Sequence, residues 1–278
     1  MNDDLKPEVF VMVKEFKKNT YDGIELYAKV DIPENPKAVI VVVHGLCEHH
    51  GRYDYVVQYL VSRDFKVYRF DHRGHGRSKG YRVYFPNKDA IVEDVKVFVD
   101  TAIEENPSLP VFLLGHSMGG YAVNFFGTKY PGIVRGIIST GAWSRNTNID
   151  ASVPVGLNPL AYSEDALDGT ICTDPAVVEA HKNDPLVEKK ISYGLFYACR
   201  EGHDWMVENA KNFIDSTFIL HGLLDEIIPE SVSRDFFADI KSIDKGLIIY
   251  PGLAHEILNE PSKDRILGHI TEWINERI

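Results

Sequence analysis

The stretch VFLLGHSMGGYAVNFF, residues 111–126, decides the fold class of this chain. Its first four residues form a short apolar run typical of a buried strand, and its last six are apolar enough to belong to a buried helix. A strand that turns this sharply into a helix needs small residues at the turn, and Gly115 and Gly119 supply them. The sequence therefore predicts that Ser117 projects from the top of a sheet.

Further strand-like segments predict a mostly parallel sheet. Short runs rich in β-branched and aromatic residues occur at 38–43, 66–70, 111–114, 134–139, 218–220 and 247–250. Apolar residues recur at helical spacing from Ile91 to Ile103, and such alternation of strands and helices is typical of right-handed parallel crossovers. Runs near Glu8–Phe16 and Ile24–Asp31 predict an antiparallel hairpin on the sheet edge.

The region from about residue 142 to residue 215 interrupts this alternation. It has many polar turns and no convincing core strand. Its short helical patches include Ile191, Leu195, Phe196 and Cys199. We predict a helical cap inserted over the carboxyl ends of the strands, where ligands bind in open α/β sheets. The expected organisation is a first core segment at 1–141, the cap at 142–215 and a second core segment at 216–278.

Composition narrows the classes of function. The chain has 278 residues, 44% of them apolar, and a formal charge of −11, which disfavours a nucleic-acid surface because phosphates require clustered cations. We therefore expect a small-molecule partner, although an amphipathic cap could touch lipid surfaces transiently. The start of the chain lacks the features of a secretory signal, and no apolar run could span a bilayer, so we expect a cytoplasmic protein. The oligomeric state is left open.

A serine in a glycine-rich turn is weak evidence by itself, because such turns can be purely structural. A serine nucleophile also needs a histidine base that a carboxylate orients. Asp225 and His255 each follow one of the last two predicted strands, so both should face the same sheet edge as Ser117. We predict these three residues as a catalytic triad. Glu226 is expected to be solvated, and His221 to be a core or turn residue.

The backbone N–H groups of Leu46 and Met118 are the predicted oxyanion donors. Gly45 permits a close turn after the strand at 38–43, and Met118 begins the helix that follows Ser117. Cys47 is expected to be inert, because no basic residue evidently activates it.

Two histidine-rich loops raise the alternative of a metal site. One contains His44, Glu48, His49 and His50, and the other is DHRGH at 71–75. Neither has the spacing of a zinc motif on a helix, and no CxxC pair is present, so we expect no metal and no cofactor. Asp71 is expected instead to hold its loop beneath the Ser117 turn by accepting backbone hydrogen bonds.

Five motifs in order, HGLCEHHGRY, FDHRGHGRS, LLGHSMGGYA, HGLLDEIIP and AHEILNE, resemble the monoacylglycerol lipase and lysophospholipase branch of the α/β-hydrolases, sometimes grouped with serine aminopeptidase-like hydrolases. The resemblance covers the chain from about residue 30 and is weakest in the cap. It implies the α/β-hydrolase fold and cofactor-free hydrolysis of carboxylic esters through an acyl-enzyme. It also implies that Glu48 lies near a glycerol head group, and that His181 occupies a substrate-binding position where tyrosine is usual.

Three alternatives stay open at this point. A carboxylesterase for short-chain or hydroxycinnamoyl esters would use the same triad with a different pocket. A peptidase of this fold would need carboxylates for a substrate amine, and Glu164, Asp165 and Asp168 are candidates. A non-catalytic binding module usually lacks a triad member. Dehalogenase and epoxide hydrolase chemistry is excluded, because it requires aspartate in place of Ser117.

Overall fold

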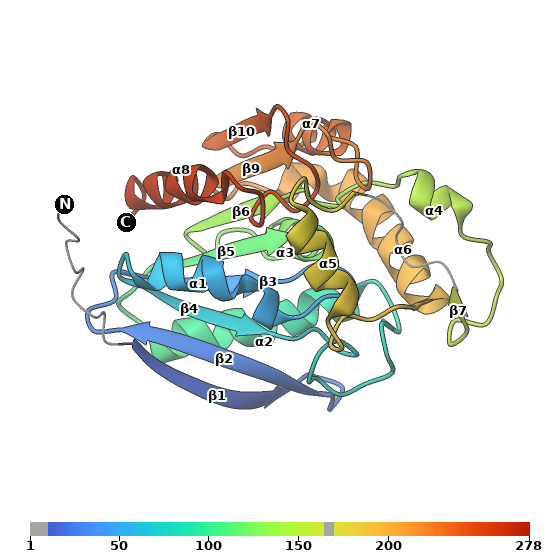
Figure 1. Ribbon diagram of the computed structural model, residues 1–278, viewed down its shortest axis with the longest axis horizontal. Coiled ribbons are helices and arrows are strands. Elements are labelled where there is room, and N and C mark those ends of the chain that lie inside the picture. The colour runs from blue at the N-terminus through green and yellow to red at the C-terminus, as the bar shows by residue number, and fades with distance from the viewer. Residues whose placement is uncertain (1–10, 164–169) are drawn as a thin grey trace.

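A mostly parallel sheet forms the centre of the molecule (Figure 1). The computed structural model describes residues 11–163 and 170–278 of the chain. In this part, eight strands pair in the order β1-β2-β4-β3-β5-β6-β9-β10. They are β1 (Val11–Asn19), β2 (Glu25–Pro33), β3 (Ala38–Val43), β4 (Phe65–Phe70), β5 (Val111–His116), β6 (Gly136–Thr140), β9 (Thr217–Gly222) and β10 (Lys245–Tyr250). The six predicted core strands are confirmed, with small shifts of their ends.

The edge hairpin is also confirmed within the described residues. Strands β1 and β2 pair antiparallel, with Val11 opposite Pro33 and Asn19 opposite Glu25. Strand β2 pairs antiparallel with β4, and every further neighbour in the sheet is parallel. Residues 8–10 of the predicted hairpin lie outside the described part of the chain.

Helices cover both faces of the sheet, so the central strands are buried on both sides. The helices are α1 (Asp54–Val61), α2 (Asp89–Glu105), α3 (Met118–Lys129), α4 (Asn148–Ser152), α5 (Pro175–Asn183), α6 (Tyr193–Asn209), α7 (Ser231–Asp239) and α8 (Lys263–Asn275), with short 3-10 helices η1 (His50–Tyr53) and η2 (Ala210–Asn212). Alternate residues of β3 point to opposite faces: Val41 packs in the cluster that contains α2 and α3, whereas Ile40 packs in the cluster that contains α1 and α8. No helix in the described residues is long and apolar enough to cross a membrane.

The segment between β6 and β9 contains α4, α5 and α6, and Figure 1 shows α4 and α6 on the side of the molecule opposite α8. Leu195, Phe196 and Cys199 lie on α6 and pack into the same apolar cluster as α3, so this face joins the cap to the core. Ile191 was wrongly expected in a helix. It lies in β8 (Ile191–Ser192), which pairs with β7 (Tyr162–Ser163), because the helix begins only after Ser192 caps it by accepting the N–H of Leu195.

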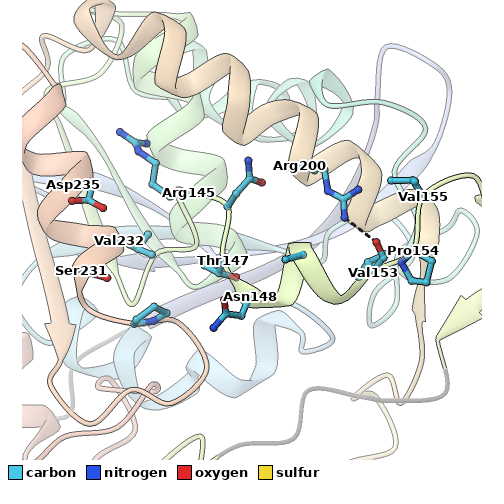
Figure 2. A pocket seen from close by; sticks show the side chains of 13 residues that line it. Arg145, Thr147, Asn148, Val153, Pro154, Val155, Arg200, Ser231, Val232 and Asp235 are labelled. Carbon is cyan, nitrogen blue, oxygen red and sulfur yellow. Dashed lines mark hydrogen bonds between the residues drawn. The ribbon is translucent and has the colours of Figure 1, made fainter.

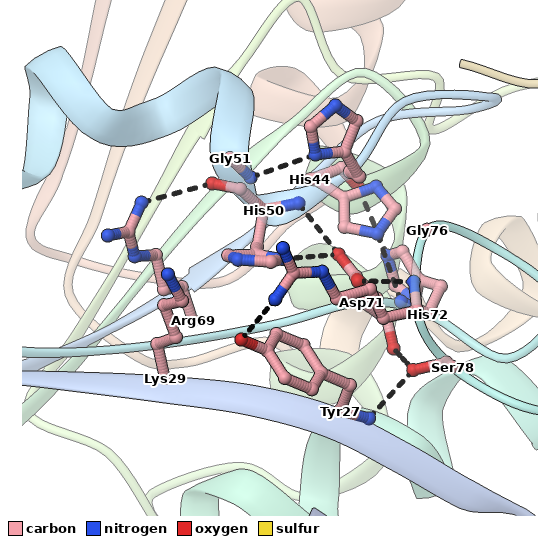
Figure 3. A network of polar contacts seen from close by, with 12 residues as sticks. Tyr27, Lys29, His44, His50, Gly51, Arg69, Asp71, His72, Gly76 and Ser78 are labelled. Carbon is pink, nitrogen blue, oxygen red and sulfur yellow. Dashed lines mark hydrogen bonds and ion pairs between the residues drawn. The ribbon is translucent and has the colours of Figure 1, made fainter. Parts of the chain in front are cut away.

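Asp71 holds the loop after β4 in a network of polar contacts (Figure 3). Its Oδ1 accepts the backbone N–H of His50 at 2.8 Å and the Nδ1–H of the same residue at 2.7 Å. Its Oδ2 accepts the N–H of Arg77 at 2.8 Å. Burial alone would raise the pKa of Asp71, but these contacts with His50 and Arg77 hold it below its usual range. The expected backbone hydrogen bonds are confirmed, and they join this loop to the start of η1.

Candidate active site

Ser117 lies in a strained turn between β5 and α3. Its backbone has φ 55° and ψ −117°, a conformation that residues with side chains rarely adopt. A Cβ atom on Gly115 would lie 2.3 Å from the carbonyl oxygen of Gly119, and one on Gly119 would lie 2.1 Å from that of Val43. Both glycines are therefore needed for the close approach of β5, α3 and β3 that holds Ser117 in place.

The structure brings Ser117, His255 and Asp225 together. The Oγ of Ser117 lies 2.9 Å from Nε2 of His255, in the loop after β10. The Nδ1–H of His255 donates to Oδ2 of Asp225 at 2.6 Å. Asp225 follows β9, and its Oδ1 accepts the N–H groups of Ile227 and Ile228 at 2.9 and 2.8 Å. This arrangement can pass the serine proton to an imidazole whose orientation a carboxylate fixes.

The electrostatics of this group favour a charged pair. Burial alone would lower the pKa of His255, but the Asp225 carboxylate outweighs it, so the pKa lies above its usual value. Burial alone would raise the pKa of Asp225, yet the imidazoles of His255 and His221 keep it well below its usual range. Asp225 therefore stays ionised and stabilises the imidazolium that would form when His255 accepts a proton.

His221 contacts Asp225, which the sequence reasoning did not predict. It is buried at the end of β9, as expected, but its Nε2–H also donates to Oδ2 of Asp225 at 3.0 Å and to the carbonyl of Ile228 at 2.9 Å. Its Nδ1 accepts the hydroxyl of Ser233 at 2.7 Å. The available signal was that a buried histidine must find polar partners, but the sequence does not say which. The neighbouring Glu226 is exposed, as expected.

The loop after β3 brings Leu46 beside the serine. A Cβ atom on Gly45 would lie 3.2 Å from Cβ of Ser117, so this loop passes close to the turn. The Oε1 of Glu48 accepts the N–H of Gly45 at 2.5 Å and fixes the loop. Met118 is the first residue of α3, where a backbone N–H has no partner inside the helix. The oxyanion role of Leu46 and Met118 stays a prediction.

A buried ion cluster forms the polar wall of the site. Arg52 donates through its Nη1 to Oε2 of Glu48 at 2.8 Å and to Oε1 of Glu256 at 2.6 Å. Its Nη2 donates to Oε2 of Glu256 at 2.7 Å. Burial alone would raise the pKa of Glu48, but Arg52 and the hydroxyl of Tyr53, 2.6 Å away, hold it below its usual value. The sequence reasoning named Glu48 but missed Arg52 and Glu256, because their pairing joins η1 to the loop that carries His255.

A cavity of about 80 Å³ lies against Ser117 and His255. Its remaining lining comes from Gly45, Leu46, Cys47, Glu48, Arg52, His116, Ile171, His181, Glu188, Lys189, Ile227 and Glu256. Both predicted substrate residues, Glu48 and His181, therefore line it. Burial and the charge of Arg52 lower the pKa of His181, which keeps its imidazole neutral. Burial raises the pKa of the Cys47 thiol to about 12, so this cysteine is a poor nucleophile, as expected.

A larger hollow of about 860 Å³ opens elsewhere, between α4, α6 and α7 (Figure 2). In Figure 2, Arg200 of α6 donates to the carbonyl of Val153, at 3.1 Å, across one end of it. None of the predicted site residues lines this hollow. The chemistry therefore points to the small cavity rather than to the large one.

One group of side chains in the described ranges is close enough to hold a metal ion. Ligand atoms of His49, His50 and Asp71 lie within 4.8 Å of one another. Both ring nitrogens of His49 are already engaged, however, because Nδ1 accepts the N–H of Gly51 at 3.1 Å and Nε2 lies 2.8 Å from Oδ2 of Asp184. Asp71 is likewise occupied by hydrogen bonds, so these residues do not fit a metal site well.

The family model described as serine aminopeptidase, S33, a hydrolase family, matches residues 34–262, which is most of the chain. The chain belongs to this family. It is a serine hydrolase with the α/β-hydrolase fold, as the ordered motifs predicted.

Relatives of this hydrolase include lipases. A monoacylglycerol lipase of Mycolicibacterium smegmatis is 35% identical, over 91% of this chain and 93% of the relative. The phospholipase YtpA of Bacillus subtilis is 28% identical, over 84% of this chain and 93% of the relative. The crystal structure of a monoacylglycerol lipase from Paleococcus ferrophilus has a TM-score of 0.78 and 27% identity, and the match covers 96% of this chain and 100% of that one.

Proposed function

We propose that this hydrolase cleaves the carboxylic ester of monoacylglycerols or lysophospholipids through an acyl-enzyme on Ser117. The observation that carries the proposal is the contact of 2.9 Å between the serine hydroxyl and His255, which Asp225 in turn orients. The similarity to a monoacylglycerol lipase over nearly the whole of both chains supports the substrate class. No cofactor is needed for this chemistry.

Each residue has a defined role in the proposed mechanism. His255 accepts the proton of Ser117 as the hydroxyl attacks the ester carbonyl, and Asp225 stabilises the resulting imidazolium. The N–H groups of Leu46 and Met118 hold the oxyanion. His255 then returns the proton to the leaving alcohol and activates a water molecule that releases the fatty acid.

The lining of the cavity contains both polar and apolar side chains. Glu48 and His181 are among the polar lining residues and are proposed to contact the alcohol part of the substrate. Leu46, Ile171 and Ile227 supply apolar lining for the start of the acyl chain. At about 80 Å³, the cavity is much smaller than the roughly 300 Å³ that small ligands require, so a long acyl chain needs the cap to move.

The cap has exposed apolar side chains that bear on how the substrate enters. Exposed apolar side chains at Val155, Leu157, Leu160 and Val207 support a transient contact with a lipid surface, from which substrate would enter. The division into core and cap at residues 142 and 215 is part of the same proposal. The peptidase alternative rests on Glu164, Asp165 and Asp168, which lie outside the described residues.

A substrate panel tests the proposed function. It contains 1-monoacylglycerols, lysophospholipids, p-nitrophenyl and hydroxycinnamoyl esters and aminoacyl arylamides, each assayed with the wild type and with Ser117→Ala. We expect turnover of glycerol esters that the variant loses. Turnover of aryl or hydroxycinnamoyl esters alone would indicate a carboxylesterase, turnover of the arylamides alone a peptidase, and the absence of all turnover and of labelling by a serine-directed phosphonate a binding protein.

A further inference from the structure

The cations that line the cavity are already engaged by the protein itself. In the described part of the chain these are Arg52 and Lys189. Both terminal nitrogens of Arg52 donate to carboxylates, at 2.6 to 2.8 Å. The Nζ of Lys189 donates to the carbonyls of His181 and Lys182 at the end of α5, at 3.4 and 3.1 Å. An anionic substrate group would have to compete with these internal partners.

The ion cluster beside the serine has an excess of negative charge. Two carboxylates, Glu48 and Glu256, share the single guanidinium of Arg52, so the three groups together carry a formal charge of −1. Glu48 and Glu256 are buried and the side chain of Arg52 is only 9% exposed, which weakens screening by solvent and strengthens the effect of this charge on a neighbouring substrate. Glu188, which also lines the cavity, pairs with Arg82, whereas Lys189 keeps its positive charge because its partners are neutral carbonyls.

Further hydrogen bonds hold Glu256 in place beside Arg52. Its carboxylate accepts a second donor, the side-chain amide of Asn259, at 2.9 Å. Its backbone N–H donates to the carbonyl of Ile171 in the cap at 2.7 Å. The contact with Arg52 is bidentate, the geometry in which arginine would also bind a phosphate. The same fork therefore cannot serve both Glu256 and a phosphate.

We propose that Glu256 makes this hydrolase selective for esters of uncharged alcohols, because it occupies the fork of Arg52 that a phosphate would otherwise bind and adds a second carboxylate beside Glu48. The inference rests on the proposed ester hydrolysis and refines its substrate class. Monoacylglycerols fit the site, whereas lysophospholipids with a phosphate monoester are rejected. Glu256 is thus a specificity-determining residue that sequence motifs did not indicate.

The test compares three soluble substrates with one acyl chain: 1-octanoylglycerol, 1-octanoylglycerol 3-phosphate and 1-octanoylglycero-3-phosphocholine. Four proteins are assayed: wild type, Glu256→Gln, Glu256→Asp and the exposed charge-matched control Glu272→Gln. Titration with a serine-directed phosphonate gives the concentration of active sites. We expect the wild type to favour the neutral ester over the phosphate at least about 100-fold in kcat/KM. Glu256→Gln should reduce this ratio about tenfold, mainly by lowering KM for the phosphorylated ester.

Two further readouts separate selectivity from a structural role. Glu256→Asp keeps the charge and should keep the preference, as should Glu272→Gln. The acid limb of the kcat/KM profile for 1-octanoylglycerol should move to lower pH in Glu256→Gln, because a negative charge that raises the pKa of His255 is lost. A variant that is merely misfolded would lose titratable sites without this shift.

Several outcomes would overturn the inference. Equal wild-type activity on the neutral and phosphorylated esters would do so and leave the proposed ester hydrolysis intact, as would an unchanged ratio in Glu256→Gln. If no octanoyl ester is cleaved, the proposed function itself fails. If Glu256→Gln does not fold, inhibition of the wild type by ether analogues tests the proposal instead. We expect 1-O-octylglycerol 3-phosphate to inhibit at least about 100-fold more weakly than 1-O-octylglycerol. Equal inhibition by the two ethers would contradict the proposal.

Discussion

The core and the cap hold their site residues in different ways. In the core, Ser117, Asp225 and His255 follow strands of one sheet, and their exposed fractions are 6, 8 and 4%. In the cap, α5 carries His181 but has no fully buried residue. The comparison indicates that the predicted triad is built on strand ends of the core, whereas the proposed contact with the substrate alcohol depends on a helix without a fully buried residue.

Several polar contacts join the cap to the core near the site. Asp184 lies 2.8 Å from Nε2 of His49, and the N–H of Glu188 donates to the carbonyl of Cys47 at 2.8 Å. The carbonyl of Ile171 accepts the N–H of Glu256. Changes in the core should therefore affect the rate of the chemical step, and changes in these contacts should affect access and KM.

The largest effect is expected in the core, at the nucleophile. Ser117→Ala should lower kcat at least about 10⁴-fold, because the covalent step is lost and only binding and oxyanion stabilisation remain. Its thermal unfolding midpoint should change little, since the substitution removes one oxygen atom. Steady-state kinetics and calorimetry on the same preparation check both parts. Near-normal esterase activity in this variant would show that the nucleophile lies elsewhere.

The next largest effect is expected at His221, which donates a hydrogen bond to Asp225 in the core. Replacing it with alanine removes a donor to Asp225, so we expect kcat to fall about 10- to 100-fold through misplacement of the carboxylate. The free energy of unfolding should also fall, by about 1–3 kcal/mol, since a buried hydrogen bond is lost. His221→Gln, which keeps a donor, should recover part of kcat. If kcat fell only in proportion to the loss of stability, and His221→Gln did not recover it, His221 would contribute to packing alone.

The pH dependence of the core site has a defined sign. His255 must be neutral to accept the serine proton, and its pKa lies above the ordinary value of 6.5. The acid limb of kcat/KM should therefore reach half of its maximum above pH 6.5, and activity should be lost as the pH falls through that point. A profile measured with 1-octanoylglycerol checks this expectation. A midpoint below pH 6.5 would mean that Asp225 does not stabilise the imidazolium.

The smallest effect is expected in the cap. Asp184→Asn weakens the pair with His49, and because Asp184 is partly exposed the loss of stability should stay below about 1 kcal/mol. We expect kcat to remain within about fivefold of the wild type, the limit that a free-energy change of about 1 kcal/mol implies for a rate. KM should change more for long acyl chains than for short ones. Measuring kcat and KM for glycerol esters from octanoyl to oleoyl tests whether Asp184 affects substrate access. A large fall in kcat would instead indicate a role in catalysis.

The core was predictable because its signals are local. Apolar runs of strand length, the glycines at 115 and 119 and the order of Ser117, Asp225 and His255 all follow from rules about single turns and strand ends. The sequence predicted the cap only as a region in which the alternation of strands and helices stops. Its Ile191 was assigned to a helix because apolar spacing in a short segment does not distinguish the end of a two-residue strand from the start of a helix.

By itself, the sequence determined the sheet, the strained turn and the side chains available for the predicted triad. Only the tertiary structure showed that His221 holds Asp225, that both nitrogens of His49 are engaged and that Glu256 occupies Arg52. The physical reason is distance along the chain. Arg52 and Glu256 are 204 positions apart, and a single sequence contains no rule that pairs two charges until folding brings them within 2.6 Å.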